Sequence, residues 1–193
     1  MVIITKKIIL DPIFLSKDYK LKIIEKINEL CYNQCTKEDG YILKVNWQIN
    51  GRKCDIIGSL DDGRIRIKYL DNTIIYTVKP ECLLNKTRIL DNYISGVNSS
   101  IIFIVEIDVD NLKPELGDIF SDKVCMIFGG GLFVDVKNKM KVLIPSNSLS
   151  KIGETFVDNK NNIIKNNDII KVKIIGVKYS TTKKNFSCFG ELN

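Results

Sequence analysis

Two cysteines are the first residues in this chain whose spacing could support chemistry. Cys31 and Cys35 stand four positions apart, a separation that a zinc site could use. Such a site needs a second pair of ligands, however, and the sequence holds no further closely spaced cysteine pair and no histidine. We therefore expect no metal and no cofactor, and we expect the six cysteines to be free thiols in a reducing compartment.

Three carboxylates form a second candidate metal site. Glu106, Asp108 and Asp110 alternate with apolar residues along positions 101–110, which is the two-residue period of a strand. Neighbours on one face of a strand lie about 7 Å apart, too far to share an ion unless the strand curves. We therefore expect a solvated acidic edge rather than a metal site.

No residue pattern typical of an enzyme is present. General acid–base catalysis near neutral pH most often uses histidine, which is absent, and there is no Gly-x-Ser-x-Gly elbow for a serine nucleophile. The glycine run at 129–131 lacks the Lys and Ser or Thr of a phosphate-binding loop, so it predicts a turn. We expect a protein that is not an enzyme.

Phenylalanines and lysines in the last third of the chain are the candidate RNA ligands. Aromatic rings stack on bases, and lysines contact phosphates without reading sequence. The candidates are Phe120, Phe128, Phe133, Lys137, Lys139, Lys141, Lys171 and Lys173. Two alternatives stay open: Phe133 suits a barrel core equally well, and abundant Lys and Asn can reflect an AT-rich genome.

A small barrel is expected to position these side chains. Apolar alternation and turn residues predict five strands, at 117–127, 132–136, 140–144, 169–177 and 186–192. A long polar connection at 158–167 separates the third strand from the fourth, as in the OB arrangement.

The preceding residues predict a separate domain. A short strand at 6–10 is followed by an amphipathic helix at 18–31. Further strands are predicted at 41–49, 53–59, 64–70, 73–78 and 101–110. One helix on such a sheet can bury a core, so the expected class is α+β, mostly β, with domains 1–114 and 115–193.

Length and charge agree with this division. The chain has 193 residues and a formal net charge of +6, enough for two small domains with a mild affinity for polyanions. Its first apolar residues are interrupted by Lys6 and Lys7, and the longest later apolar run, at 101–105, is far shorter than a membrane span. We therefore expect no signal peptide and no membrane partner.

The barrel segment resembles the S1 type of OB fold. The resemblance rests on Gly117, Gly-Leu-Phe-Val at 131–134, Leu-Ile-x-x-x-Ser-Leu at 143–149 and Ile-Ile-Gly-Val at 174–177. Many RNA-binding S1 domains carry a histidine where this chain has Pro145, so stacking would fall to the three phenylalanines. A barrel used only for protein contacts is the alternative, since a fold does not decide function.

The order of motifs resembles the larger stalk subunit of archaeal and eukaryotic-type DNA-dependent RNA polymerases. Asp-Pro after the first strand, the helix, and Gly-Tyr-Ile-Leu-Lys-Val at 40–45 precede an S1 barrel that ends in Phe-x-Cys-x-Gly-Glu-Leu. The resemblance implies a non-catalytic subunit with three partners: the polymerase core, a smaller helical stalk subunit and nascent single-stranded RNA. It implies core docking through Asp11, Pro12, Ile13, Phe14, Gly40 and Tyr41. The middle segment 46–97 is longer than is usual in this family.

Two other roles and two origins remain open. The chain could be a free-standing S1-type factor that binds single-stranded RNA in translation or RNA decay, or a structural scaffold. Its enrichment in Ile, Lys and Asn and its long middle segment favour a large cytoplasmic DNA virus. The expected location is then the virion and the host cytoplasm, in the virus factory. An AT-rich unicellular eukaryote, with a nuclear protein, is the alternative.

Overall fold

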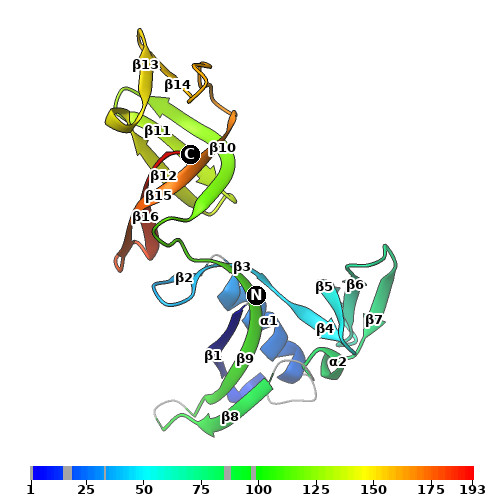
Figure 1. The fold of residues 1–193 in the computed structure, drawn as a ribbon. Coiled ribbons are helices and arrows are strands. Elements are labelled where there is room, and N and C mark those ends of the chain that lie inside the picture. Colours follow the sequence, from blue (N-terminus) through cyan, green and yellow to red (C-terminus); the bar gives the residue numbers. More distant parts are fainter. Residues whose placement is uncertain (1, 15–18, 33, 85–87, 97–98) are drawn as a thin grey trace. The chain divides into compact units, whose positions relative to one another are not determined.

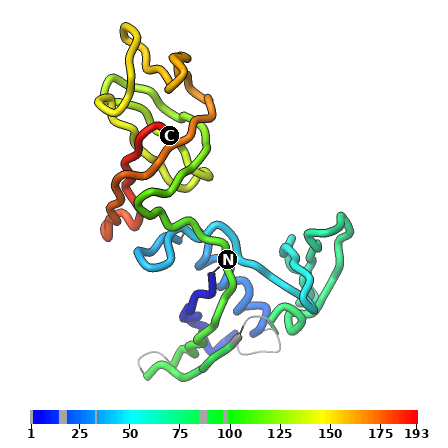
Figure 2. Tube along the Cα trace, in the orientation of Figure 1, coloured from blue at the N-terminus to red at the C-terminus, as the bar shows by residue number. Residues whose placement is uncertain are grey.

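The chain folds into two compact units. A computed structural model describes residues 2–14, 19–32, 34–84, 88–96 and 99–193, and Figure 2 traces the backbone with the remaining residues in grey. The first unit comprises Met1–Gln34 and Ile42–Leu112, and the second comprises Cys35–Tyr41 and Lys113–Asn193. The sequence assigned all of 1–114 to one domain, whereas the structure assigns Cys35–Tyr41 to the second unit, because these residues contact the barrel rather than the first core.

The main sheet of the first unit joins strands that lie far apart in the sequence (Figure 1). Its strands are β1 (Val2–Leu10), β3 (Gly40–Val45), β8 (Arg88–Ile94) and β9 (Ile101–Leu112). The short strand β2 (Cys35–Thr36) pairs with Gly40 and Tyr41 at the start of β3, and these residues belong to the second unit. β9 lies between β1 and β3, and it pairs antiparallel with both β1 and β8. The sequence did not predict β8, because a bulge between Ile89 and Asp91 breaks its two-residue alternation.

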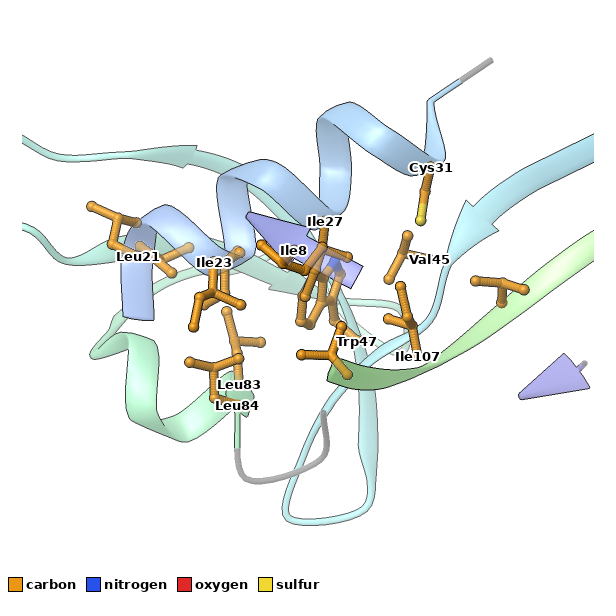
Figure 3. Close-up of a cluster of buried hydrophobic side chains, with 14 of the residues drawn as sticks. Ile8, Leu21, Ile23, Ile27, Cys31, Val45, Trp47, Leu83, Leu84 and Ile107 are labelled. Atoms are coloured by element: carbon orange, nitrogen blue, oxygen red, sulfur yellow. The ribbon is translucent and has the colours of Figure 1, made fainter. Parts of the chain in front are cut away.

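Helix α1 (Tyr19–Cys31) packs its buried face into the first core. Its apolar residues recur every three or four positions, which places them on one face. The buried residues of the helix are Leu21, Ile23, Ile24, Ile27 and Cys31. Figure 3 shows Ile27 beside Ile8 and Trp47, and Ile23 beside Leu83 and Leu84. The predicted helix is confirmed from Tyr19 onward, while its expected first residue, Asp18, lies outside the described residues.

A second sheet holds the middle segment of the chain. It contains β4 (Trp47–Ile49), β5 (Arg52–Ser59), β6 (Ile65–Tyr69) and β7 (Ile75–Val78) in that order, followed by the short helix α2 (Pro80–Leu84). The prediction of one strand at 41–49 was wrong: the strand ends at Val45, and the chain passes into this second sheet. The change lets Trp47 bury its ring in the first core, with its Nε1 donating to Asn28 Oδ1 at 3.3 Å.

Two acidic residues of β9, Asp108 and Asp110, bind Asn46, which follows the end of β3. The backbone N–H of Asn46 donates to the carbonyl oxygen of Asp108 at 2.8 Å. Its side-chain Nδ2 donates to Asp110 Oδ1 at 3.0 Å and to Asp108 Oδ1 at 3.4 Å. The opposite face of β9 is buried as the alternation predicted, with Phe103, Val105, Ile107 and Val109 in the core. All three carboxylates are therefore half-buried rather than a freely solvated edge, and Asp108 and Asp110 have a structural role.

The second unit contains a closed five-stranded barrel. Its strands are β10 (Ile119–Phe128), β11 (Gly131–Val136), β12 (Met140–Pro145), β15 (Ile169–Ser180) and β16 (Asn185–Leu192). They close in the order β10-β11-β12-β16-β15, with β12 and β16 parallel and the other pairs antiparallel. The expected fold class, α+β and mostly β with a closed OB-type barrel, is confirmed.

The connection between β12 and β15 is more ordered than its polar sequence predicts. A single turn, η2 (Ser146–Ser148), leads into a hairpin of β13 (Ser150–Ile152) and β14 (Thr155–Val157). The buried side chains of Phe156 and Val157 anchor this hairpin. The sequence did not predict it, because strands of three residues are too short to show a two-residue period. Of the helices in the described residues, none is long and apolar enough to cross a membrane.

Candidate nucleic-acid interface

An apolar row crosses the outer face of the barrel on three neighbouring strands. Phe133 of β11 lies opposite Leu143 of β12, and Leu143 lies beside Phe189 of β16. Their chain neighbours Leu132 and Cys188 are buried inside the barrel. Because successive side chains of a strand point to opposite faces, the row faces outward. Phe189 is 46% exposed, so its ring contributes apolar surface to the outer face of the barrel.

A second ring extends this row into an aromatic platform. Phe128, at the end of β10, stacks on Phe133 with ring centroids 5.7 Å apart and an interplanar angle of 17°. The turn between them needs glycine at position 131, where φ is +143°. A Cβ at Gly131 would lie 2.1 Å from the carbonyl oxygen of Ile144. The tight turn therefore returns β11 so that the two rings meet.

A pocket of about 470 Å³ opens beside the row, within the second unit. Rings and apolar side chains form most of its wall, namely Tyr41, Phe133, Leu143, Phe186 and Phe189. Lys139 and Lys141 also line the pocket and bring positive charge to it. Aromatic surface beside ammonium groups is the combination that holds single-stranded nucleic acid, with bases on the rings and phosphates on the lysines.

Tyr41 closes one side of the pocket and is a structural residue of the barrel unit. Its side chain is buried, and its hydroxyl accepts a hydrogen bond from the backbone N–H of Phe186 at 3.0 Å. Tyr179 packs on the ring of Phe186 and donates its hydroxyl to the carbonyl oxygen of Cys35 at 3.1 Å. Burial raises the pKa of Tyr41, so its hydroxyl stays protonated at neutral pH.

The predicted RNA ligands fall into two groups. Phe128, Phe133, Lys139 and Lys141 belong to the platform and pocket. Phe120, Lys137, Lys171 and Lys173 do not line the pocket.

Each member of the second group has a different local role. Phe120 lies opposite the fully buried Val172, so its ring turns toward the barrel interior. Lys137 occupies a turn, where its backbone N–H donates to Asp122 Oδ2 at 2.9 Å. On β15, the Nζ of Lys173 lies 3.4 Å from a carboxylate oxygen of Glu191, and Lys171 is exposed two residues earlier.

The predicted docking residues are divided between the two units. Asp11 ends β1, and its Oδ1 accepts a hydrogen bond from the backbone N–H of Ile13 at 3.0 Å. This bond shapes the turn η1 (Pro12–Phe14), which leaves Ile13 77% exposed and Phe14 42% exposed. Gly40, by contrast, lies in the second unit with a φ of +75° and pairs with Thr36. Tyr41 also lies there, and its side chain is buried.

Four of the six cysteines are buried. All six are free thiols. Burial raises the pKa of Cys35, Cys54 and Cys188 to about 11, so these three stay protonated at neutral pH. In the described part of the chain, no group of three or more His, Cys, Asp and Glu residues is arranged to hold a metal ion.

Several pocket residues were not among the sequence candidates for RNA binding. Phe189 and Asn185 alternate with the buried Phe186 and Cys188 along β16, so the two-residue period could have placed them on the outer face. Leu143 could have been found in the same way on β12. No local signal assigns Tyr41 to this pocket, because its contact with Phe186 joins residues 145 positions apart.

Comparison with known proteins identifies the barrel. Residues 113–189 match the S1 RNA binding domain. The chain is similar to a polyribonucleotide nucleotidyltransferase of Rickettsia canadensis, 26% identical over 137 residues, which are 71% of this chain and 14% of that protein. The corresponding protein of Rickettsia massiliae is 24% identical over the same shares, so the chain spans only a small part of these relatives. The second unit of this chain therefore carries an S1 RNA-binding domain.

Proposed function

We propose that this protein is a non-catalytic stalk subunit of a DNA-dependent RNA polymerase, whose barrel contacts nascent single-stranded RNA. The observation that carries the RNA contact is the pocket with its aromatic platform and two lysines, on a domain of the S1 RNA-binding type. Transcripts share phosphates and base faces whatever their sequence, and these are the features that lysines and aromatic rings bind.

The polymerase assignment draws its support from the order of elements. A strand, an Asp-Pro turn, one amphipathic helix and an antiparallel sheet precede the S1 barrel, as in the larger stalk subunit that the sequence resembles. The exposed apolar pair Ile13 and Phe14 offers a surface for docking to the polymerase core. A smaller helical subunit would complete the stalk, and the virion and virus factory, or alternatively a nucleus, would be the place of action.

Affinity purification tests the polymerase assignment. The tagged chain, purified from the cells that express it, should carry the two large polymerase subunits, identified by mass spectrometry. Ile13→Asp combined with Phe14→Asp should release them, because the pair is exposed and the change puts charge in the contact. Ile152→Asp, at a residue 56% exposed in the barrel unit, is the matched control and should retain them. Unchanged copurification of the double variant would contradict docking through η1.

A second candidate function is a free-standing S1 factor that binds single-stranded RNA in translation or RNA decay. The similarity to polyribonucleotide nucleotidyltransferases favours it. The same purification separates the two functions. A free-standing factor would bind RNA in vitro yet bring down no polymerase subunit from cells, whereas a stalk subunit would do both.

A further inference from the structure

A row of basic side chains runs along β6, on the face of the second sheet that points away from the first core. Arg64, Arg66 and Lys68 are exposed, while the two isoleucines between them are buried in that core. Successive side chains of a strand point to opposite faces, so the three cations share the outer face and span about 13 Å. We call these three residues the basic stripe.

The strands on either side of β6 add positive charge to the same face (Figure 1). On β5, Lys53 is exposed and lies next to the buried Cys54, so its side chain points to the outer face. At the end of β7, Lys79 is exposed and follows Val78, which pairs with Ile65 of β6. The basic stripe therefore lies between two further lysines.

The carboxylates around the basic stripe do not cancel its charge. Asp62 pairs with Arg64, and Asp55 of β5 pairs with Lys44 of β3. A third carboxylate, Asp61, lies in the turn between β5 and β6, beyond the end of the stripe. The outer face of this sheet therefore carries a net positive charge, and a basic stripe on one face is the electrostatic footprint of nucleic-acid binding.

The aromatic rings of this sheet lie on its other face. Trp47 is buried in the first core, and Tyr69 and Tyr76 pack against that core with their ring centroids 5.2 Å apart. Beside the stripe, β7 presents Ile75 and Thr77 instead. Sites for single strands combine phosphate contacts with rings that stack on bases, whereas a duplex keeps its bases stacked and presents its phosphates. Charges without rings therefore suit a duplex.

We propose that the basic stripe binds the phosphate backbone of double-stranded nucleic acid. This second nucleic-acid site lies in the first unit, and it does not rest on the function proposed for the barrel. The contact is electrostatic, so its affinity depends on salt and not on base sequence. Duplex DNA and duplex RNA both offer such a backbone, and titrations with each tell the two sources apart.

Arg66→Ala combined with Lys68→Ala tests the site in the full chain. Anisotropy titrations use fluorescein-labelled DNA and RNA duplexes of about 20 base pairs, together with single-stranded U12 RNA. The parent should bind a duplex, and the double variant should bind it about tenfold or more weakly at about 0.1 M salt. For DNA, the slope of log binding constant against log salt should fall by about 1.8, at about 0.9 per phosphate contact. Binding of U12, which we assign to the barrel, should stay unchanged.

Two control variants separate the basic stripe from net charge and from folding. Lys7→Ala with Lys26→Ala removes the same number of charges from exposed positions on β1 and α1, and it should leave duplex binding unchanged. Arg66→Lys with Lys68→Arg keeps the charges and should retain duplex affinity within about twofold. All three double variants should unfold at the parental temperature, because the changed side chains are exposed.

Three results would overturn the site. They are failure of the parent to bind either duplex, parental duplex affinity after Arg66→Ala with Lys68→Ala, and an equal loss after Lys7→Ala with Lys26→Ala. The last result would mean that net charge alone explains the binding. A parent that binds a duplex but not U12 would instead contradict the function proposed for the barrel and leave the basic stripe intact.

Discussion

Replacement of Phe133 by leucine tests the aromatic platform most directly. The ring is half-buried, stacks on Phe128 at 5.7 Å and lines the pocket. Leucine retains most of the apolar packing, so the free energy of unfolding should fall by less than about 1.5 kcal/mol. Base stacking, in contrast, contributes about 1–3 kcal/mol per base. We expect the dissociation constant for single-stranded RNA to rise about five- to 30-fold, which corresponds to about 1–2 kcal/mol.

The two rings should act as a unit. Because Phe128 and Phe133 stack on each other, removing either one also changes the surface that the other presents. The effects of Phe128→Leu and Phe133→Leu on binding free energy should therefore add to more than the effect of the double variant. Anisotropy titration of a labelled 12-nucleotide RNA at one fixed salt concentration measures all three, with thermal unfolding as the check on folding.

Ile119→Ala provides the control for apolar area as such. Ile119 is 53% exposed on β10 and does not line the pocket. Its replacement should leave the dissociation constant unchanged. Phe133→Leu protein that unfolds at the parental temperature and binds RNA with parental affinity would refute the platform, and Phe133 would then be a barrel-packing residue only.

Three further predictions concern charge, the turn and pH. Lys139→Ala with Lys141→Ala should lower the slope of log binding constant against log salt by about 1.4, at about 0.7 per phosphate contact; the matched pair Lys171→Ala with Lys173→Ala should not, since neither residue lines the pocket. Gly131→Ala should destabilise the barrel by more than about 2 kcal/mol in urea unfolding, because its Cβ would meet the Ile144 carbonyl oxygen, whereas Gly129→Ala, with open space around it, should be close to neutral. Burial raises the pKa of Cys35, Cys54 and Cys188 from 9.0 to about 11. The folded protein therefore keeps protons that the unfolded chain loses, and under reducing conditions the urea midpoint should be lower at about pH 10 than at about pH 8; equal midpoints would contradict the raised values.

The sequence predicted the helices and strands in which the spacing of apolar residues matches the face that is buried. β9 alternates buried and half-buried side chains from Phe103 to Asp110, as its sequence predicted. α1 repeats apolar residues at helical spacing, and the barrel strands β11 and β12 carry buried apolar residues at every second position. In these segments one face is buried, and the hydrophobic effect then imposes the periodicity that the sequence displays.

Irregular elements escaped prediction where a long-range contact overrides the local pattern. Residues 41–49 alternate as one strand, yet the bonds from Asn46 to Asp108 and Asp110 end β3 and send Trp47 into another sheet. The bulge in β8 similarly disrupts the period from which strands are inferred. The partners of Asn46 lie 62 and 64 positions away, and β8 is defined by its pairing with another strand, β9, so local sequence alone reveals neither feature.

In the candidate site, too, the sequence predicted some features and only the structure revealed others. The sequence alone determined that Phe128, Phe133 and the lysines of the β11–β12 hairpin belong to a barrel of a nucleic-acid-binding type. Only the tertiary structure decided which of these side chains meet. Register across β11, β12 and β16 joins Phe133, Leu143 and Phe189, because side chains directly opposite in neighbouring strands share a face. The backbone N–H of Phe186 needs an acceptor because it is buried, and the fold supplies the hydroxyl of Tyr41. This bond brings Tyr41 into the wall of the pocket, beside Asn185.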